Sequence, residues 1–154
     1  MSELSTRWLN EQEMQVWRRW LRAQTEVPAA LARALKEDDS ELSMQDYETL
    51  VHLTEAEDGR LRISALADTM HWERSRLSHH LRRMELRQLI AKEECASDGR
   101  GAFVAITEDG RAALAAAAPG HLAAVRRIFL DGANEEELDV LATFLERVLT
   151  RSGE

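Results

Sequence analysis

The sequence predicts a mainly α-helical protein that carries one small β-wing, and three observations support this. Apolar residues recur at helical spacing over residues 8–35 and again over 138–149. Residues 73–87 combine an apolar helical stripe with several arginines. The segments 89–95 and 102–106 have the character of strands, and a tight Ser-Asp-Gly-Arg-Gly turn lies between them.

Composition limits the class of protein. The length of 154 residues suits one domain over residues 1–154, or a small core domain with dimerisation helices, and the apolar content of 44% makes a packed core feasible. The single cysteine, Cys95, excludes an intramolecular disulfide and suits a reducing compartment. No apolar run approaches the ~20 residues needed to span a bilayer, and Arg18, Arg19 and Arg22 interrupt any N-terminal signal sequence. We therefore expect a cytoplasmic protein with no membrane segment.

The net charge of −8 is distributed unevenly. Residues 74–92 contain six basic residues and one acid, Glu85, so a positive patch lies on an otherwise acidic chain. Such a patch can hold phosphate groups, and it can equally be an ordinary solvated helix face. Charge alone leaves both interpretations open, and the arginine-tipped wing that follows favours the first.

The N-terminal region is expected to be one long helix over residues 8–35. Pro28 lies inside the pattern and predicts a kink or break near residues 26–27. The apolar side includes Trp17 and Leu21, which need cover in so small a chain. We favour a second subunit as that cover, and the alternative is that the tryptophans cap the single core.

A charged linker over residues 36–41 leads into the next helix. Ser43 is predicted as its N-cap, with Asp46 as the acid of a capping box. Gly59 suits a left-handed C-cap, and residues 61–63 should be extended. Ser64 is predicted to cap a short helix over 65–70, and a turn at 71–73 leads into the basic helix. This pair of short helices is the helix-turn-helix arrangement.

The basic helix has two different sides. Leu77, Leu81 and Met84 form the apolar stripe, and His80 lies near its edge. The opposite face and its flanks carry Ser75, Arg76, Ser78, His79, Arg82, Arg83 and Arg87. His79 and His80 diverge by about 100° on a helix and cannot share a metal ion, so both imidazoles are expected to face DNA or solvent.

The C-terminal part is expected to be helical again. Thr107 is predicted to cap a helix that contains the alanine-rich run 112–118. Pro119 and Gly120 are expected to bend or break it. Asn134 is predicted as the N-cap of a last helix with a clear apolar stripe.

Several motifs, in this order and spacing, together resemble the MarR family of bacterial winged-helix regulators. They are Ser75-Arg76-Leu77-Ser78, Leu81-Arg82-Arg83-Met84-Glu85, Leu89-Ile90, Asp98-Gly99-Arg100-Gly101 and Ile106-Thr107-Glu108-Asp109-Gly110. The resemblance implies a single MarR-like domain and a homodimer. It assigns residues 8–36 and 119–151 to dimerisation, 43–106 to the winged helix-turn-helix and 107–118 to the start of a connecting helix.

The resemblance also implies a set of DNA-binding residues. Those expected at the major groove or its flanking phosphates are Arg74, Ser75, Arg76, Ser78, His79, Arg82 and Arg83. Arg100 would enter the minor groove, held by Asp98. Two positions depart from the family pattern. Gln88 stands where a glycine is usual and is expected to strain or lengthen the helix end, and Gly99 replaces a residue that is often basic.

A small anionic, often aromatic, ligand is the usual effector in the family. The resemblance places it between the dimer body and the DNA-binding lobe, where Arg18 or Arg22 could meet the anion. The candidate lining residues are Trp17, Arg18, Trp20, Met44, Tyr47, His52 and His71. Plain core packing is the alternative for each aromatic or apolar member of this set.

The sequence contains no catalytic constellation, so neither an enzyme nor a cofactor or metal is expected. Cys95 follows two glutamates, which should keep its thiol sluggish, so a structural role is favoured over redox sensing. The predicted function is a dimeric regulator that binds a palindromic site on double-stranded DNA, with repression favoured over activation. The alternative is a winged-helix module that docks a protein partner and lacks strong DNA binding.

Overall fold

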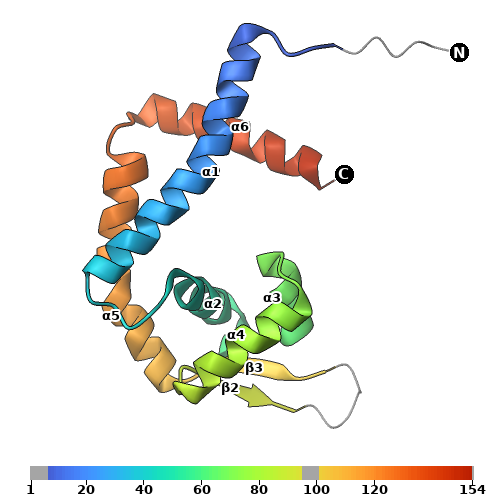
Figure 1. The fold of residues 1–154 in the computed structure, drawn as a ribbon, viewed down its shortest axis with the longest axis vertical. Coiled ribbons are helices and arrows are strands. Elements are labelled where there is room, and N and C mark those ends of the chain that lie inside the picture. The colour runs from blue at the N-terminus through green and yellow to red at the C-terminus, as the bar shows by residue number, and fades with distance from the viewer. Residues whose placement is uncertain (1–6, 95–100, 154) are drawn as a thin grey trace, which may run out of the picture. The chain divides into compact units, whose positions relative to one another are not determined.

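The computed structural model describes residues 7–94 and 101–153 and is mainly helical (Figure 1). The helices are α1 (Glu11–Glu37), α2 (Met44–Glu55), α3 (Ile63–Met70), α4 (Arg74–Leu86), α5 (Glu108–Val125) and α6 (Glu135–Ser152). The strands are β1 (Arg60–Arg62), β2 (Ile90–Glu93) and β3 (Phe103–Ile106). A 3₁₀ turn, Glu57–Gly59, precedes β1, and a π-helical turn, Arg126–Leu130, follows α5. The predicted fold class, mainly α with a small β-wing, is confirmed.

The chain forms two compact units. The central unit, Ala32–Ala123, contains the end of α1, helices α2 to α4, the sheet and most of α5. The terminal unit contains the chain up to Leu31 and from Ala124 onward, which includes most of α1 and all of α6. Each unit is described by itself below.

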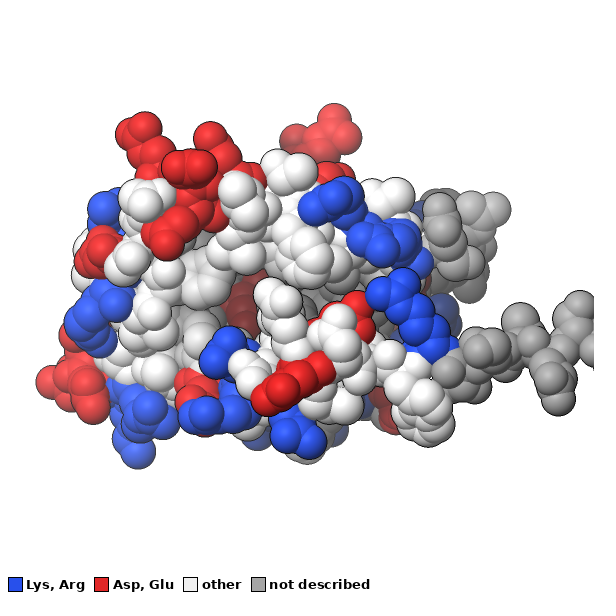
Figure 2. All heavy atoms as spheres, turned by 90° about the horizontal axis from the view of Figure 1, so that it is seen from above, with Lys and Arg blue, Asp and Glu red and all other residues white. Residues whose placement is uncertain are grey.

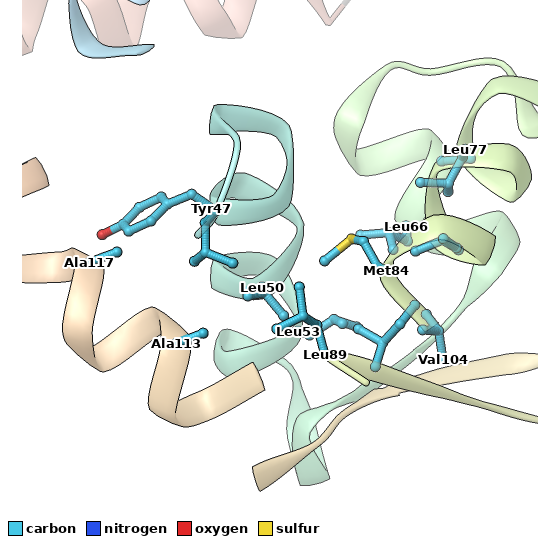
Figure 3. Close-up of a cluster of buried hydrophobic side chains, with 14 of the residues drawn as sticks. Tyr47, Leu50, Leu53, Leu66, Leu77, Met84, Leu89, Val104, Ala113 and Ala117 are labelled. Atoms are coloured by element: carbon cyan, nitrogen blue, oxygen red, sulfur yellow. The ribbon is translucent and has the colours of Figure 1, made fainter. Parts of the chain in front are cut away.

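The core of the central unit brings together side chains from α2, α3, α4 and the sheet. Leu50, Leu66, Leu77 and Val104 have no exposed surface, although they come from four different elements (Figure 3). The small residues of α5 in this cluster, Ala113 and Ala117, lie against the α2 side. Burial of this apolar surface is the main free-energy term that holds α4 in place.

The sheet is antiparallel, with strand order β1-β3-β2. Ile90 pairs with Ile106, and Glu93 pairs with Phe103, which is the register of a two-stranded wing. Arg60 forms an ion pair with Glu93 at 3.2 Å and lies over the Phe103 ring. These contacts join β1 to the base of the wing. Cys95, Asp98, Gly99 and Arg100 lie outside the described residues, so their predicted roles stay predictions.

The predicted helix caps at polar side chains are confirmed at three positions. Ser43 and Asp46 form a capping box at α2, and Asn134 and Glu137 form a second one at α6. The Thr107 hydroxyl accepts a hydrogen bond from the Gly110 amide at 3.0 Å at the start of α5. Each cap satisfies an amide that the first helical turn cannot pair.

At both prolines the predicted break is wrong, and the predicted alternative of a kink or bend stays a prediction. Helix α1 continues through Pro28, and α5 continues through Pro119. One proline removes a single backbone hydrogen bond, and the bonds of the adjoining turns maintain each of these long helices. The N-terminal helix also begins later than expected, at Glu11, where Asn10 and Glu13 exchange capping hydrogen bonds.

The predicted cap at Ser64 is also wrong, because α3 already begins at Ile63. The Ile63 amide donates to the Ala102 carbonyl at 3.1 Å, so the chain beside β3 satisfies it instead of a side-chain cap. Gly59 is left-handed as predicted, with φ +66°, but it closes the 3₁₀ turn because α2 has already ended at Glu55.

The terminal unit exposes much apolar surface. None of the side chains of α6 is buried, and Val140 and Leu149 are each 65% exposed. Trp17 of α1 is 50% exposed. Figure 2 shows a face on which acidic and basic side chains surround a broad area of uncharged ones. Surfaces of this kind are typical of a protein that associates with a partner.

The exit from α4 depends on a non-glycine residue in a left-handed conformation. The Gln88 amide donates to the Glu85 carbonyl at 2.9 Å, and the Leu89 amide donates to the Met84 carbonyl at 3.1 Å. These two bonds form a Schellman motif that stops the helix at Leu86. Gln88 has φ +62°, a left-handed conformation that cannot continue the helix, so α4 is not lengthened. The expected strain lies in the backbone of Gln88, because a residue with a Cβ disfavours this conformation.

Replacement of Gln88 by glycine is therefore expected to stabilise the protein. Glycine adopts positive φ without a Cβ penalty, which stabilises the folded state. The larger conformational entropy of glycine in the unfolded chain cancels part of this stabilisation. We expect the free energy of unfolding in urea, at fixed protein concentration, to rise by about 0.5–1 kcal/mol. Gln88→Ala keeps the Cβ and is the control. Equal stability of the two variants would contradict the assignment of strain to this position.

Candidate nucleic-acid interface

Helix α4 has one face buried in the core and one face exposed to solvent. Leu77, Leu81 and Met84 have no exposed surface and belong to the core. The predicted DNA-binding residues on this helix are all exposed, namely Arg74, Ser75, Arg76, Ser78, His79, Arg82 and Arg83. Apolar residues at helical spacing therefore bury one face of α4 and leave a row of cations and small polar groups in solvent.

The turn between α3 and α4 orients this row. His71 has φ +53°, and its amide donates to the Asp68 carbonyl at 3.2 Å. The Trp72 amide donates to the Ala67 carbonyl at 3.0 Å, which completes a second Schellman motif. A histidine takes the position that glycine often fills, and α4 begins two residues after Trp72.

Aromatic contacts restrain one of the exposed cations. The Arg76 guanidinium lies 4.0 Å from the centre of the Trp72 ring. The Trp72 ring in turn meets the His80 ring edge to face, with 5.4 Å between their centroids. A cation stacked on an aromatic ring loses less freedom when it binds, so Arg76 is partly preorganised for an anionic partner.

A buried carboxylate joins the start of α2 to the end of α4. Asp46, at the start of α2, accepts a hydrogen bond from Arg87 Nη1 at 2.7 Å and one from the Ser43 amide at 2.9 Å. The second Arg87 nitrogen, Nη2, donates to the Glu41 carbonyl. Burial alone would raise the pKa of Asp46, but the Arg87 guanidinium and the Ser43 hydrogen bonds lower the pKa below its ordinary value. The carboxylate is therefore charged and paired.

Sequence reasoning missed this pair. It treated Asp46 only as a capping acid and Arg87 only as a flanking helix residue. The two residues are 41 positions apart, and no local pattern relates them. Arg87 thus fastens the end of α4 to the start of α2, and its guanidinium is engaged with protein groups.

His80 corrects one sequence-based expectation. Its side chain does not face DNA or solvent, because only 5% of its surface is exposed. Nε2 lies 3.5 Å from Asp46 Oδ1, and Nδ1 lies 3.5 Å from Arg83 Nη2. Burial lowers the pKa of His80, which the Asp46 charge only partly opposes, so the ring is neutral at pH 7. Its neighbour His79 is exposed, as expected.

The residues proposed for an effector are divided between the two units. Trp17, Arg18 and Trp20 belong to the terminal unit and are exposed. In the central unit Tyr47 is buried against His121, with ring centroids 4.3 Å apart, and Met44 packs on the core. The remaining two differ, since His52 is half-buried on α2 and His71 is exposed in the turn before α4. Core packing therefore applies to Tyr47 and Met44, and a ligand-binding role for the set stays a prediction.

In the described ranges 7–94 and 101–153, no group of three or more histidine, cysteine, aspartate or glutamate side chains is arranged to hold a metal ion. Within the same ranges, no helix combines the length and apolarity needed to cross a membrane.

The pairing of Asp46 with Arg87 predicts different effects for two arginines of similar exposure to solvent. Arg87→Met leaves the buried carboxylate without its guanidinium and should lower the free energy of unfolding by about 1–3 kcal/mol. Arg82→Met, the control on the exposed row, should change it by no more than about 0.5 kcal/mol. Urea unfolding at pH 7 checks both values.

The pH dependence should follow from the lowered pKa of Asp46. The contribution of the pair is present above the ordinary aspartate pKa of 3.8 and is lost as the pH falls through the lower folded-state pKa. The stability difference between wild type and Arg87→Met should therefore shrink in strong acid. Equal stability of Arg87→Met and Arg82→Met at pH 7 would overturn this role for Arg87.

Comparisons with known proteins agree with this architecture. A family model of the transcriptional regulators SarA/Rot matches residues 33–116. AbsC, a MarR family transcriptional regulator from Streptomyces coelicolor, is 39% identical, with 97% of this chain and 100% of that chain covered and a TM-score of 0.86. Sco3205, a MarR family transcriptional regulator from the same organism, was crystallised in complex with DNA. It is 36% identical, with 94% and 90% coverage and a TM-score of 0.84.

A more distant structure is that of CouR from Rhodococcus jostii RHA1, bound to p-coumaroyl-CoA. It is 26% identical, with 82% of this chain and 86% of that chain covered and a TM-score of 0.67. A comparison with curated protein sequences finds no match. Since the family model spans more than half of the chain, and two MarR regulators share more than a third of its residues over nearly their whole length, the chain belongs to the MarR family of winged-helix transcriptional regulators.

Proposed function

We propose that this regulator binds a palindromic operator as a homodimer and inserts α4 of each protomer into the major groove. The observation that carries the proposal is the exposed row on α4, opposite a fully buried face. Arginine can pair in bidentate fashion with guanine, and serine and histidine can add single hydrogen bonds. The residues assigned to this contact are Arg74, Ser75, Arg76, Ser78, His79, Arg82 and Arg83. The complex of Sco3205 with DNA supports the proposal by similarity.

The wing is proposed to supply the second contact. Strands β2 and β3 pair in register up to Glu93 and Phe103, and residues 94–102 join them in the sequence. Arg100 belongs to that segment and is proposed to enter the minor groove with Asp98 as its partner. An arginine in a narrow minor groove responds to shape and negative potential rather than to a base code.

Dimerisation is proposed to involve the terminal unit, within residues 8–36 and 119–151. A helix of 18 residues with no buried side chain is not stable on its own sequence propensity, because most helical stability comes from packing of an apolar face. Val140 and Phe144, which lie four residues apart on one side of α6, and Trp17 on α1 provide exposed apolar surface of this kind. A two-fold axis would then place two α4 helices one DNA turn apart, about 34–36 Å.

Regulation by a small ligand completes the proposal, with repression as its favoured outcome. CouR, which is similar in fold and sequence, was crystallised with p-coumaroyl-CoA, an aromatic anionic molecule. The candidate ligand residues here are Trp17, Arg18, Trp20, Met44, Tyr47, His52 and His71. A ligand that binds one conformation of the dimer more tightly than the other shifts the population away from the DNA-binding form.

The DNA-binding proposal predicts tight, salt-sensitive binding to the DNA that flanks the protein's own gene. Fluorescence anisotropy should show saturable binding that exceeds binding to a scrambled duplex by about a thousandfold or more. Arg82→Ala should weaken operator binding and relax its specificity, at a cost of about 1–3 kcal/mol. Arg100→Ala tests the wing in the same assay.

One other outcome discriminates the alternatives. Equal, weak binding to operator and scrambled duplex, with no other genomic fragment bound at low salt, would reject the DNA-binding proposal. It would favour the alternative of a winged-helix module that docks a protein partner. A stability measurement on Arg82→Ala separates loss of contact from loss of fold, since the side chain is exposed.

The dimer proposal predicts two protomers in solution by light scattering coupled to size exclusion. Phe144→Asp places a charge on the exposed apolar face of α6 and should shift the protein toward monomer and weaken operator binding. Thr143→Asp is the matched control on the adjacent exposed position. A wild-type protein that remains monomeric at micromolar concentration would contradict the proposal.

A further inference from the structure

We infer that His80 is a positioning residue for DNA binding, because its buried ring holds the Arg83 guanidinium in one orientation. The inference rests on the proposed function, in which Arg83 belongs to the DNA-binding row on α4. It goes beyond that function by giving a role to a side chain on the buried face of the helix. His80 lies three residues before Arg83, so the two side chains are neighbours on the helix surface. Only 5% of His80 is exposed, whereas Arg83 is exposed, so the pair connects the core to the row.

The neighbours of the His80 ring determine which of its nitrogens carries the proton. Nε2 faces the Asp46 carboxylate, with Oδ1 at 3.5 Å, and the backbone of Gln45. Nδ1 faces Arg83 Nη2, also at 3.5 Å. A charged carboxylate can only accept a hydrogen bond, and a guanidinium can only donate one. The neutral ring therefore carries its proton on Nε2 and leaves the lone pair of Nδ1 as an acceptor for Arg83.

The His80 ring is itself held in place by its surroundings. Asp46, which it faces, is fixed by Arg87 Nη1 at 2.7 Å and by the Ser43 amide at 2.9 Å. The Trp72 ring meets the His80 ring edge to face, with 5.4 Å between their centroids. The acceptor that Arg83 meets therefore belongs to a side chain with little freedom to move.

Two arginines of the exposed row rest on this pair of rings. The Arg76 guanidinium lies over Trp72, and Arg83 meets Nδ1 of His80. The Arg83 contact is longer than the roughly 2.7–3.2 Å of most N–H···O hydrogen bonds, so it restricts the guanidinium without locking it. A long side chain whose conformations are already restricted loses less freedom when it binds a partner. Arg83 is therefore partly preorganised, as Arg76 is.

Protonation of His80 would reverse its effect on Arg83. A proton on Nδ1 removes the acceptor and places a positive charge beside the guanidinium. The charges that act on the ring are Asp46 on α2, Arg83 on α4 and Arg87 at the end of α4, while Trp72 in the preceding turn is uncharged. Burial has the largest effect and lowers the pKa of His80 below its ordinary value of 6.5, so the ring takes up a proton only in acidic solution. The pKa of Asp46 is lowered from 3.8, so this carboxylate stays charged in mild acid.

The first test is a double-mutant cycle in the operator anisotropy assay at neutral pH. His80→Phe keeps a ring beside Trp72 but has no nitrogen that can accept a hydrogen bond from Arg83. It should weaken operator binding by about three- to tenfold, the range expected when one long side chain loses its preorganisation. Arg83→Ala removes the guanidinium itself. The double variant should therefore bind no more weakly than Arg83→Ala alone.

Two controls separate positioning from a general loss of structure. In the Arg82→Ala background, which keeps Arg83, His80→Phe should retain its full effect. His80→Asn has an amide oxygen that can occupy the region of Nδ1 and accept from Arg83, so it should recover most of the affinity that His80→Phe loses. Urea unfolding checks that each variant is folded under the conditions of the assay.

A pH series tests the same contact without replacing a buried residue, and it decides the question if His80→Phe does not fold. As the pH falls from about 7.5 to about 5, the His80 ring takes up a proton and should release Arg83. The advantage of the wild type over Arg83→Ala in operator affinity should therefore shrink, whereas its advantage over Arg82→Ala should stay constant. His79 is present in all three proteins, so its contribution cancels in these ratios.

Distinct results would overturn the inference. If the effects of His80→Phe and Arg83→Ala on operator affinity add, His80 does not act through Arg83. If the wild-type advantage over Arg83→Ala is constant across the pH series, the His80 ring is not the group that holds the guanidinium. Failure of the wild type to discriminate the operator from any other duplex would instead reject the proposed function itself.

Discussion

The ion pair between Asp46 and Arg87 is the constraint on which the DNA-binding unit depends. A buried carboxylate needs a counter-charge, and here the guanidinium comes from the far end of α4. The same carboxylate also completes the capping box at the start of α2. The Asp46 side chain thus caps the start of α2 and also fixes the position of the end of α4 relative to α2. The exposed row on α4 can bind an anionic partner with little reorganisation because its ends are already held.

The residues of α4 either pack in the core or lie exposed on the outer face of the helix. Leu77, Leu81 and Met84 bury its inner face, whereas the arginines of the outer face are exposed. Arg87, just after the helix, is also exposed, but its donors are used by Asp46 and by the Glu41 carbonyl. The positive charge of the segment therefore overstates the number of cations available to an anionic partner. The Arg76 guanidinium is accessible to an anionic partner, although it also stacks on the Trp72 ring.

Local features were predictable from the sequence for physical reasons. The caps at Ser43, Thr107 and Asn134 use side chains that reach only their own helix turn, so nearby residues suffice to identify them. The exposed face of α4 follows from helical periodicity. The Ser64 prediction failed because a distant group, the Ala102 carbonyl, took the place of the expected cap. The predicted breaks at Pro28 and Pro119 failed because the hydrogen bonds of the adjoining turns maintain these long helices.

The sequence by itself determined the fold class, the order of the elements and the composition of the exposed face of α4. These depend on periodicity and on short-range hydrogen bonding, which a linear pattern contains. The tertiary structure alone decided that Asp46 pairs with Arg87 and that His80 is buried between Asp46 and Arg83. Each of these requires residues from different elements to meet, and burial then sets their protonation and pairing, which no local spacing encodes.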